Sequence, residues 1–263
     1  MQAGGARSGA AEIEGWLAGS HHRAMCGRTR LITDYSEIRI ELKFDDEGRG
    51  PNLRPRWNIA PSEDLLVAVR DAEGKRRPQL MRWGLIPAWA KDTKIAFSTF
   101  NARADGVDVK PAFRGAWKEG RRCLVVTDGF YEWRKSGNKD HQPFAVGMAD
   151  GKLMVMAGLY EDWTSPAGEK IRTVTVITTD ANAALEDIHP RMPVVLAKKD
   201  WAKWLGEEKA GEAELKALLR PCPAGAIRLW PVDRRVGNVK NDDPGLVEPV
   251  TIAPPAPKQA SLF

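Results

Sequence analysis

The stretch FAVGMADGKLMVMAGLY, residues 144–160, carries the clearest secondary-structure signal in this chain. Two apolar runs, 144–148 and 153–160, flank the turn sequence Ala149-Asp150-Gly151-Lys152. Short apolar runs bounded by turn residues are typical of strands, and an Asp-Gly pair between two such runs favours a tight turn. The stretch therefore predicts an antiparallel β-hairpin.

The rest of the chain repeats this pattern of short apolar runs and turns. Further strands are expected over 65–69, 80–85, 123–126 and 173–178. Helical patterns are fewer and cover 35–42, 181–188 and 212–219, with Asp180 placed as the N-cap of the middle one. Strands without regular intervening helices predict an α+β fold that is β-rich and mainly antiparallel, and argue against a doubly wound sheet.

Composition separates the two ends of the chain from its body. Residues 1–24 are rich in Ala, Gly and Ser, and the tail 249–263 contains the string APPAPKQ. Both compositions are typical of unstructured segments, so we expect a single domain over 25–248. Either residues 1–24 form a flexible extension, or the functional start is Met25.

Overall composition limits the class of protein. The 263-residue chain is 43% apolar and 29% charged, with a formal net charge of +5. This basic excess permits a polyanionic partner without demanding one. No apolar stretch approaches the length of a membrane span, and residues 1–24 lack the apolar core of a signal peptide. We expect a soluble cytoplasmic protein with no membrane partner.

The cysteine content argues against a disulfide scaffold or a zinc ribbon. The three cysteines, Cys26, Cys123 and Cys222, are odd in number and widely spaced, a usage that favours a reducing compartment. We interpret Cys123, inside an apolar run, as a core residue, and Cys222, between two prolines, as a loop thiol. No spacing typical of metal ligands occurs, so we expect neither a metal nor a cofactor.

The dipeptide Met25-Cys26 heads the run MCGRTR and offers unusual chemistry. If translation starts at Met25, the methionine is removable because cysteine is small, and Cys26 then carries both a thiol and a free α-amine. That pair is a dual nucleophile for aldehydes. As written, 24 residues precede Met25, and a Cys26 inside a peptide bond has no free amine. The alternative interpretation is a buried structural cysteine.

Six short strings occur in this order along the chain: MCGRTR, NIAPSE at 58–63, MRWGLIPAW at 81–89, NAR at 101–103, RRCLVVTDGFYEW at 121–133 and HPRMPVVL at 189–196. Together they resemble the SOS response-associated peptidase (SRAP) family, and the resemblance runs from Met25 to about Glu248. The resemblance implies a β-rich fold with a barrel-like core, peripheral helices and a narrow positive cleft for single-stranded DNA. It also implies covalent capture of abasic deoxyribose by the N-terminal cysteine. The family's peptidase label is attached to self-cleavage that would expose this cysteine.

Four residues in these strings are the expected catalytic set. Cys26 is the nucleophile. Glu132 lies between two aromatic residues. Desolvation of its carboxyl by these neighbours should raise the pKa of the carboxyl toward the range useful for proton transfer. His189 titrates near neutrality and suits a proton shuttle, and Asn101 can position an amine or a sugar hydroxyl. Taken singly, each also has a structural interpretation, such as a strand-end glutamate, a packed histidine or a turn asparagine; Asp128 is the nearest rival of Glu132.

A second set of residues is expected to contact DNA. Arginine grips phosphate bidentately, which favours Arg103 and Arg191 as phosphate ligands, although each could also be a solvated charge. Trp83 and Trp89 are either base-stacking platforms or core residues. The family often has Glu soon after NAR, where this chain has Asp105, to which we assign no role. The full expected DNA-binding set is Arg28, Asn58, Pro61, Trp83, Trp89, Arg103, Arg114 and Arg191.

Together these patterns predict a monomeric sensor and shield for abasic sites in single-stranded DNA. Its proposed chemistry is a thiazolidine crosslink through Cys26 made in the DNA damage response, with the protein associated with the nucleoid while bound. Two alternatives stay open. One is a cysteine peptidase that uses Cys26, His189 and Asn101 or Glu132 on protein substrates. The other is a non-covalent DNA-binding module in which the preceding residues keep Cys26 blocked.

Overall fold

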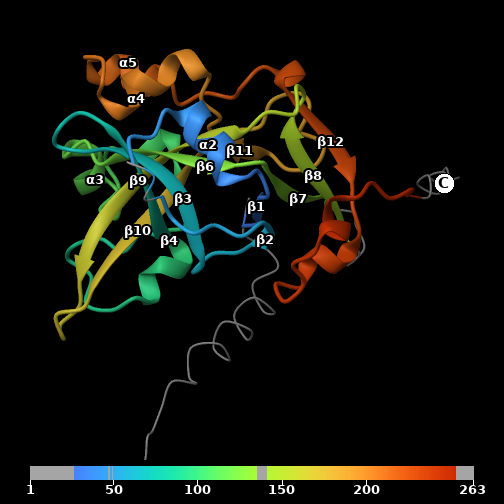
Figure 1. The fold of residues 1–263 in the computed structure, drawn as a ribbon, viewed down its shortest axis with the longest axis horizontal. Helices are drawn as coiled ribbons and strands as arrows, with labels where there is room; N and C mark the ends of the chain where they lie inside the picture. Colours follow the sequence, from blue (N-terminus) through green and yellow to red (C-terminus); the bar gives the residue numbers. More distant parts are fainter. Residues whose placement is uncertain (1–26, 47, 49, 135–140, 253–263) are drawn as a thin grey trace, which may run out of the picture.

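The computed structural model describes residues 27–252 apart from 47, 49 and 135–140. Cys26, residues 1–24 and the tail beyond 252 lie outside the described residues. Within the described part, the chain forms two mainly antiparallel sheets with short helices around them (Figure 1). The expected fold class, α+β and β-rich, is confirmed.

The larger sheet closes into a five-stranded barrel. Strand β10 pairs with β4 on one side and with β9 on the other, and β3 and β6 complete the ring. The β10–β4 pairing is parallel, and the other pairings in the ring are antiparallel. The barrel strands are β3 (Asp64–Arg70), β4 (Arg76–Trp83), β6 (Arg122–Thr127), β9 (Met154–Thr164) and β10 (Lys170–Asp180).

Two short strands extend β10 beyond the ring. β5 (Asn101–Arg103) pairs with it in parallel, and β11 (Arg191–Pro193) pairs with it antiparallel. Both pairings involve the last residues of β10, so the NAR and HPRMPVVL strings meet at one end of this strand.

The second sheet is antiparallel throughout and has the strand order β12-β8-β7-β1-β2. Strand β1 lies between β2 and β7 and carries the MCGRTR string into the sheet. The strands are β1 (Thr29–Leu31), β2 (Arg56–Ile59), β7 (Gly129–Arg134), β8 (Gln142–Met148) and β12 (Ile227–Pro231).

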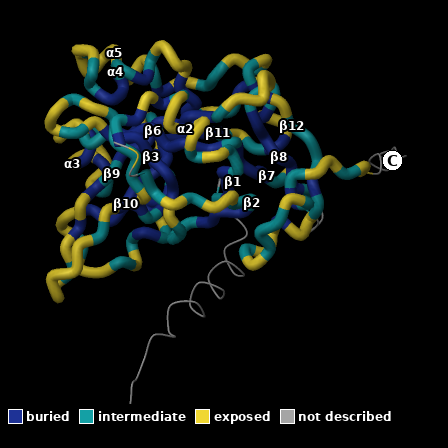
Figure 2. Tube along the Cα trace, in the orientation of Figure 1, coloured by how far each residue is buried: buried dark blue, intermediate teal, exposed yellow. Residues whose placement is uncertain are grey.

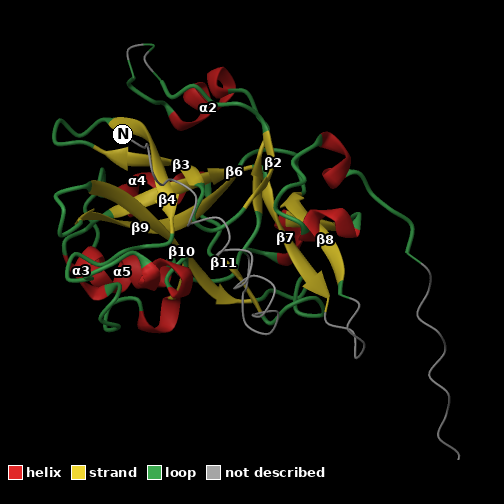
Figure 3. Ribbon diagram, turned by 90° about the horizontal axis from the view of Figure 1, so that it is seen from below, coloured by secondary structure: helices red, strands yellow, loops and turns green. Residues whose placement is uncertain are grey.

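The helices are short and lie at the periphery of the sheets (Figure 3). Helix α2 begins after Asp34, whose side chain accepts a hydrogen bond from the Ser36 N–H as an N-cap. Helix α2 spans Tyr35–Leu42. The other α-helices are α3 (Arg114–Lys118), α4 (Trp201–Leu205) and α5 (Glu212–Ala217). The 3-10 segments are η1 (Lys94–Ser98), η2 (Ala104–Gly106), η3 (Lys198–Asp200), η4 (Ala224–Ala226), η5 (Arg234–Gly237) and η6 (Pro244–Val247).

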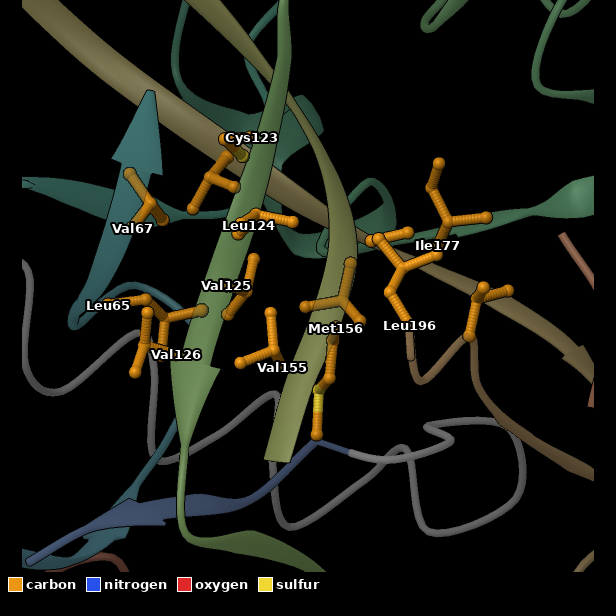
Figure 4. Close-up of a cluster of buried hydrophobic side chains, with 14 of the residues drawn as sticks. Leu65, Val67, Cys123, Leu124, Val125, Val126, Val155, Met156, Ile177 and Leu196 are labelled. Atoms are coloured by element: carbon orange, nitrogen blue, oxygen red, sulfur yellow. The ribbon is translucent and has the colours of Figure 1, made fainter. Parts of the chain in front are cut away.

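The main core fills the barrel and continues toward the second sheet. Buried residues are concentrated along the strands, and exposed ones lie in the connecting loops and helices (Figure 2). Side chains from β3, β6, β9 and β10, among them Leu65, Val125, Met156 and Ile177, lie together in this core (Figure 4). Cys123 is fully buried there, which confirms its interpretation as a core residue.

The predicted hairpin at 144–160 is wrong in its pairing, although both strands and the turn are present. The turn forms with Gly151 at φ 75° and the Gly151 N–H donating to the Met148 carbonyl at 3.1 Å. However, β8 pairs with β7 and β12, whereas β9 pairs with β6 and β10. Because each strand has both edges occupied by other partners, the turn instead carries the chain from one sheet to the other.

Most of the other predicted strands and helices are confirmed, and one helix is not. Strands over 65–69, 123–126 and 173–178 and the helix over 35–42 are confirmed, while β4 and α5 overlap their predicted ranges only in part. The helix predicted over 181–188 is wrong. Asp180 ends β10 instead of capping a helix, and Asn182 Oδ1 accepts the N–H groups of Ala184 and Leu185 in a compact turn.

Replacement of Gly129 by alanine should destabilise the second sheet severely. Gly129 has φ 142°, and a Cβ there would lie 2.0 Å from the Val146 carbonyl oxygen. We expect Gly129→Ala to lower the free energy of unfolding by about 3 kcal/mol or more, measured by urea denaturation. Gly151→Ala is the matched control, since Gly151 also has positive φ but a Cβ would meet nothing within 4 Å; its cost should be about 1 kcal/mol. Equal costs for the two variants would contradict this account.

Candidate functional site

Gly27, the first described residue, lies in space next to residues of two other parts of the chain. A Cβ built on Gly27 would lie 3.8 Å from Cε2 of Phe100 and 3.9 Å from Cγ of Pro61. Phe100 immediately precedes Asn101, and Pro61 belongs to the NIAPSE string. The start of MCGRTR is therefore next to both of these strings.

Glu132 approaches the same point from β7. Thr29 pairs with Phe130, and the Tyr131 N–H donates to the Arg28 carbonyl at 3.0 Å, so one step further along this register Gly27 faces Glu132. The Glu132 residue is only 2% exposed, and its Oε1 accepts the Trp133 N–H at 3.1 Å. The burial expected from its aromatic neighbours is thus present.

A small internal cavity shows how the strings converge. It lies between the two sheets and is lined by Thr29 and Phe130 from one sheet and by Trp83, Val176 and Pro193 from the other. Thr29, Phe130, Trp83 and Pro193 belong to four different strings, and Val176 is the register partner of Asn101. Segments far apart in the sequence therefore meet at the junction of the barrel and the second sheet.

His189 lies just before β11 on the barrel side of this junction. Its main-chain N–H donates to the Leu185 carbonyl at 3.0 Å, and its ring Nδ1 accepts the Arg191 N–H at 3.2 Å. Because Nδ1 acts as an acceptor, the neutral ring carries its proton on Nε2. The half-buried imidazole is therefore held in one tautomer and orientation by its own loop.

Arg103 and Arg191 lie on either side of the end of β10. Arg103 pairs in register with Thr178, and an Arg191 Nη2 hydrogen donates to the Thr178 hydroxyl. Both arginines line an open pocket of about 510 Å³, together with Lys216 from α5. Arg103 also forms a bidentate ion pair with Asp105. The structure thus brings the two expected phosphate ligands together.

Two residues of the expected DNA-binding set, Trp83 and Asn58, are interior, and for Trp83 this agrees with the alternative of a core residue. Trp83 is 2% exposed and donates its indole N–H to the Phe100 carbonyl at 2.8 Å. The Asn58 side chain is fully buried, and its Nδ2 lies within 3.1 Å of three carbonyl oxygens in the segment 236–241. Both residues support neighbouring segments from inside. Trp89, by contrast, is 61% exposed.

Arg28, a third member of the expected DNA-binding set, is also buried. Its Nη2 donates to the Gly237 carbonyl at 3.1 Å, and its guanidinium lies 6.0 Å from the centroid of the Trp133 ring. Burial lowers the pKa of this guanidinium. Arg28 therefore fastens η5 to the second sheet, whereas Arg114 is exposed at the start of α3 and Pro61 is half-buried beside Gly27.

Sequence reasoning missed Asp242 and Thr178. The Asp242 carboxylate accepts the main-chain N–H groups of Trp57 and Asn58 and pairs with Arg56, which ties the C-terminal segment to β2. The local sequence Asp-Asp-Pro at 242–244 contains nothing that indicates a partner so distant in the chain. Thr178 is one residue in an apolar strand, and only the fold shows that its hydroxyl donates to the Ala102 carbonyl and accepts from Arg191.

Neither a metal cluster nor a membrane helix occurs in the described part of the chain. Among residues 27–252, apart from the gaps given above, no group of three or more His, Cys, Asp or Glu side chains is arranged to hold a metal ion. No helix in that part is long and apolar enough to cross a membrane.

Comparisons with known proteins support one family. The model of the family described as SOS response associated peptidase (SRAP) matches residues 25–239. "Abasic site processing protein YoqW" of Bacillus subtilis is 37% identical over 224 residues, covering 85% of this chain and 99% of that relative. "Abasic site processing protein HMCES" of Gallus gallus is 31% identical over 279 residues, covering 90% of this chain and 81% of that relative.

Solved structures show the same fold. A crystal structure of a protein from Bacteroides thetaiotaomicron superposes with a TM-score of 0.76 at 26% identity, covering 86% of this chain and 100% of that one. A second, from Bordetella bronchiseptica, gives a TM-score of 0.68 at 25% identity, covering 79% of this chain and 100% of that one.

Truncation of Asn58 should loosen the segment that it holds. Asn58→Ala leaves the carbonyls of Val236, Asn238 and Asn241 without their buried donor, so we expect a loss of about 2 kcal/mol in unfolding free energy. Hydrogen exchange of residues 234–242 should accelerate. Asn238→Ala serves as the control, because that side chain only accepts an exposed turn N–H from Lys240. Unchanged exchange in Asn58→Ala would show that other contacts hold the segment.

Proposed function

The chain belongs to the SOS response-associated peptidase (SRAP) family, and from that premise we propose that it captures abasic sites in single-stranded DNA as a covalent adduct of Cys26. The observation that carries the proposal is the burial of Glu132 on β7, at the position to which the β1–β7 register extends from Thr29 toward Gly27. The relatives named as abasic site processing proteins supply the substrate class. Asn101 and His189 enter from strings that meet at the same junction.

The proposed chemistry needs an aldehyde and a free α-amine. A ring-opened abasic sugar presents an aldehyde at C1′, and the Cys26 amine adds to it and loses water to give an imine. The thiolate then adds to the imine carbon while the nitrogen takes up the proton, which closes a five-membered thiazolidine. An α-amine with a pKa of about 7.7–8 is roughly one-tenth neutral at pH 7, against about 0.04% for a lysine. Ring closure is fast because both nucleophiles belong to one residue.

The surrounding residues take distinct parts in this proposal. Glu132 transfers protons during sugar-ring opening and dehydration, and its burial supports such a role. His189 presents an Nε2–H that can donate to a leaving oxygen, and Asn101 positions the sugar by hydrogen bonding. Arg103 and Arg191 bind the flanking phosphates, and Trp89 offers an exposed ring for an adjacent base.

The free amine requires that residues 1–25 are absent from the active form. The family match begins at residue 25, which supports removal of the preceding segment by a start at Met25 or by processing. Cleavage next to Met25 would also account for a peptidase name without any activity on other proteins.

The central test is a crosslinking assay that uses Cys26→Ser, with Cys222→Ser as the control for a second thiol. Protein whose N-terminus is Cys26, as verified by mass spectrometry, is incubated with single-stranded DNA that carries one abasic site. We expect a heat-stable shifted band that Cys26→Ser abolishes and Cys222→Ser retains. Cleavage of an unrelated protein without any DNA adduct would favour a peptidase, and binding without an adduct would favour a non-covalent module.

The amine itself is tested by blocking it. Protein that retains residues 1–25 should form no thiazolidine, because its Cys26 nitrogen is an amide. Rates are compared with those of protein that begins at Cys26, using the same abasic oligonucleotide. Equal rates for the two forms would refute the dual-nucleophile mechanism.

The role of Glu132 predicts a rate effect that leaves the fold unchanged. Glu132→Gln keeps the shape of the side chain but removes its acid–base function, so crosslinking should slow by about a hundredfold. Single-turnover gel kinetics measure the rate, and circular dichroism with urea denaturation checks the fold. A rate within about threefold of the parent would exclude proton transfer by this carboxyl as a large contribution.

A further inference from the structure

The guanidinium of Arg103 forms a bidentate ion pair with the carboxylate of Asp105. Its Nε donates to Asp105 Oδ1 at 2.8 Å, and its Nη2 donates to Asp105 Oδ2. Two parallel N–H···O bonds are the same geometry in which a guanidinium grips a phosphate. The Arg103 pairing lowers the pKa of the Asp105 carboxyl, so Asp105 is ionised at neutral pH and competes as an anion.

The ion pair forms part of the wall of the open pocket at the end of β10. Arg191 and Lys216 line the same pocket, and Lys216 is likewise held by a carboxylate, Asp108, at 2.6 Å. The side chains of Arg103 and Asp105 are 46% and 61% exposed. A phosphate that enters the pocket can therefore reach the guanidinium, but it must replace Asp105 to use both N–H groups.

We propose that Asp105 is a specificity-determining residue that competes with DNA phosphate for Arg103. The inference rests on the proposed function, because it concerns the phosphate contact of that same DNA site. In the free protein Asp105 holds the guanidinium, and a bound strand displaces it. The exchange of one anion for another makes the reversible grip on DNA weaker than a free arginine would give.

A weakened phosphate contact suits a protein whose selectivity comes from a covalent step. Phosphate contacts carry no information about the presence of a base, so a strong grip would hold the protein on intact strands. Competition by Asp105 lowers that occupancy. Stable attachment then depends on the reaction with the aldehyde, which only an abasic site supplies.

The opposite role is equally well defined, and it predicts an effect of opposite sign. If Asp105 instead held Arg103 in the orientation that DNA needs, its removal would weaken binding. The sign of the change in affinity therefore distinguishes competition from positioning.

The test compares the parent and Asp105→Asn, both in a Cys26→Ser background, for binding of a fluorescein-labelled 15-nucleotide single strand without a lesion. Fluorescence anisotropy is measured at several salt concentrations. We expect Asp105→Asn to bind about fivefold tighter, the factor that an exposed ion pair can contribute. The salt dependence should steepen by about 0.7 in log Kd against log salt, as for one more neutralised phosphate on a single strand. Unchanged or weaker binding overturns the proposal.

The pair Arg172–Asp162 provides a matched control. It is bidentate, with contacts of 2.5 and 2.9 Å, and its side chains are 39% and 57% exposed. Arg172 precedes Thr178 by six residues on β10, about 20 Å along the strand, beyond the Debye length of about 8 Å in physiological salt. Asp162→Asn makes the same charge change and should leave affinity unchanged. Equal tightening by both variants would attribute the effect to net charge and overturn the proposal.

A double variant separates this inference from the proposed function. In an Arg103→Ala background, Asp105→Asn should no longer tighten binding, because the residue that it frees is missing. If the parent and all variants fail to bind single-stranded DNA, the proposed function itself fails. If they bind but Asp105→Asn tightens binding equally with and without Arg103, only the role of Asp105 fails.

Discussion

The arrangement of the molecule depends on the pairing of one long strand. β10 has 11 residues and hydrogen-bonds with β9, β4, β5 and β11 at different positions along its length. Its first part closes the barrel, and its last part holds the two short strands that carry Asn101 and Arg191. Because one rigid strand serves both purposes, the positions of the site residues are fixed by the same main-chain hydrogen bonds that close the core. Such preorganisation is what a reaction between two correctly placed groups requires.

The second sheet fixes the other half of the site by burying charge. Arg30 is 4% exposed and donates to the carbonyls of Asp128 and Val146, and its guanidinium stacks against Tyr131 and Trp230. Arg28, two residues before Arg30, holds η5 through a hydrogen bond to the Gly237 carbonyl. Both arginines contact mainly carbonyl oxygens and aromatic faces. β1 is thereby held firmly up to Gly27.

Sequence patterns predicted what short-range physics decides and failed where partners are distant. The helix Tyr35–Leu42 follows from a local cap at Asp34, and the apolar runs of β3, β6 and β10 follow from burial. The 144–160 hairpin failed because edge partners for both strands lie elsewhere in the chain. Residues in the strings were identified by pattern, but the pattern could not separate an interior Trp83 from an exposed Trp89. That distinction depends on which side of β4 and its loop faces the barrel.

The position of β1 between β2 and β7 also has a consequence for synthesis of the chain. Thr29 pairs with Phe130, a partner that the ribosome adds about 100 residues later. At roughly 5–20 residues per second, the first strand waits about 5–20 s before its place in the sheet exists. During that interval β1 lacks β7, one of its two neighbours in the sheet. The second sheet therefore cannot be completed until β7 has been synthesised, although β1 is made first.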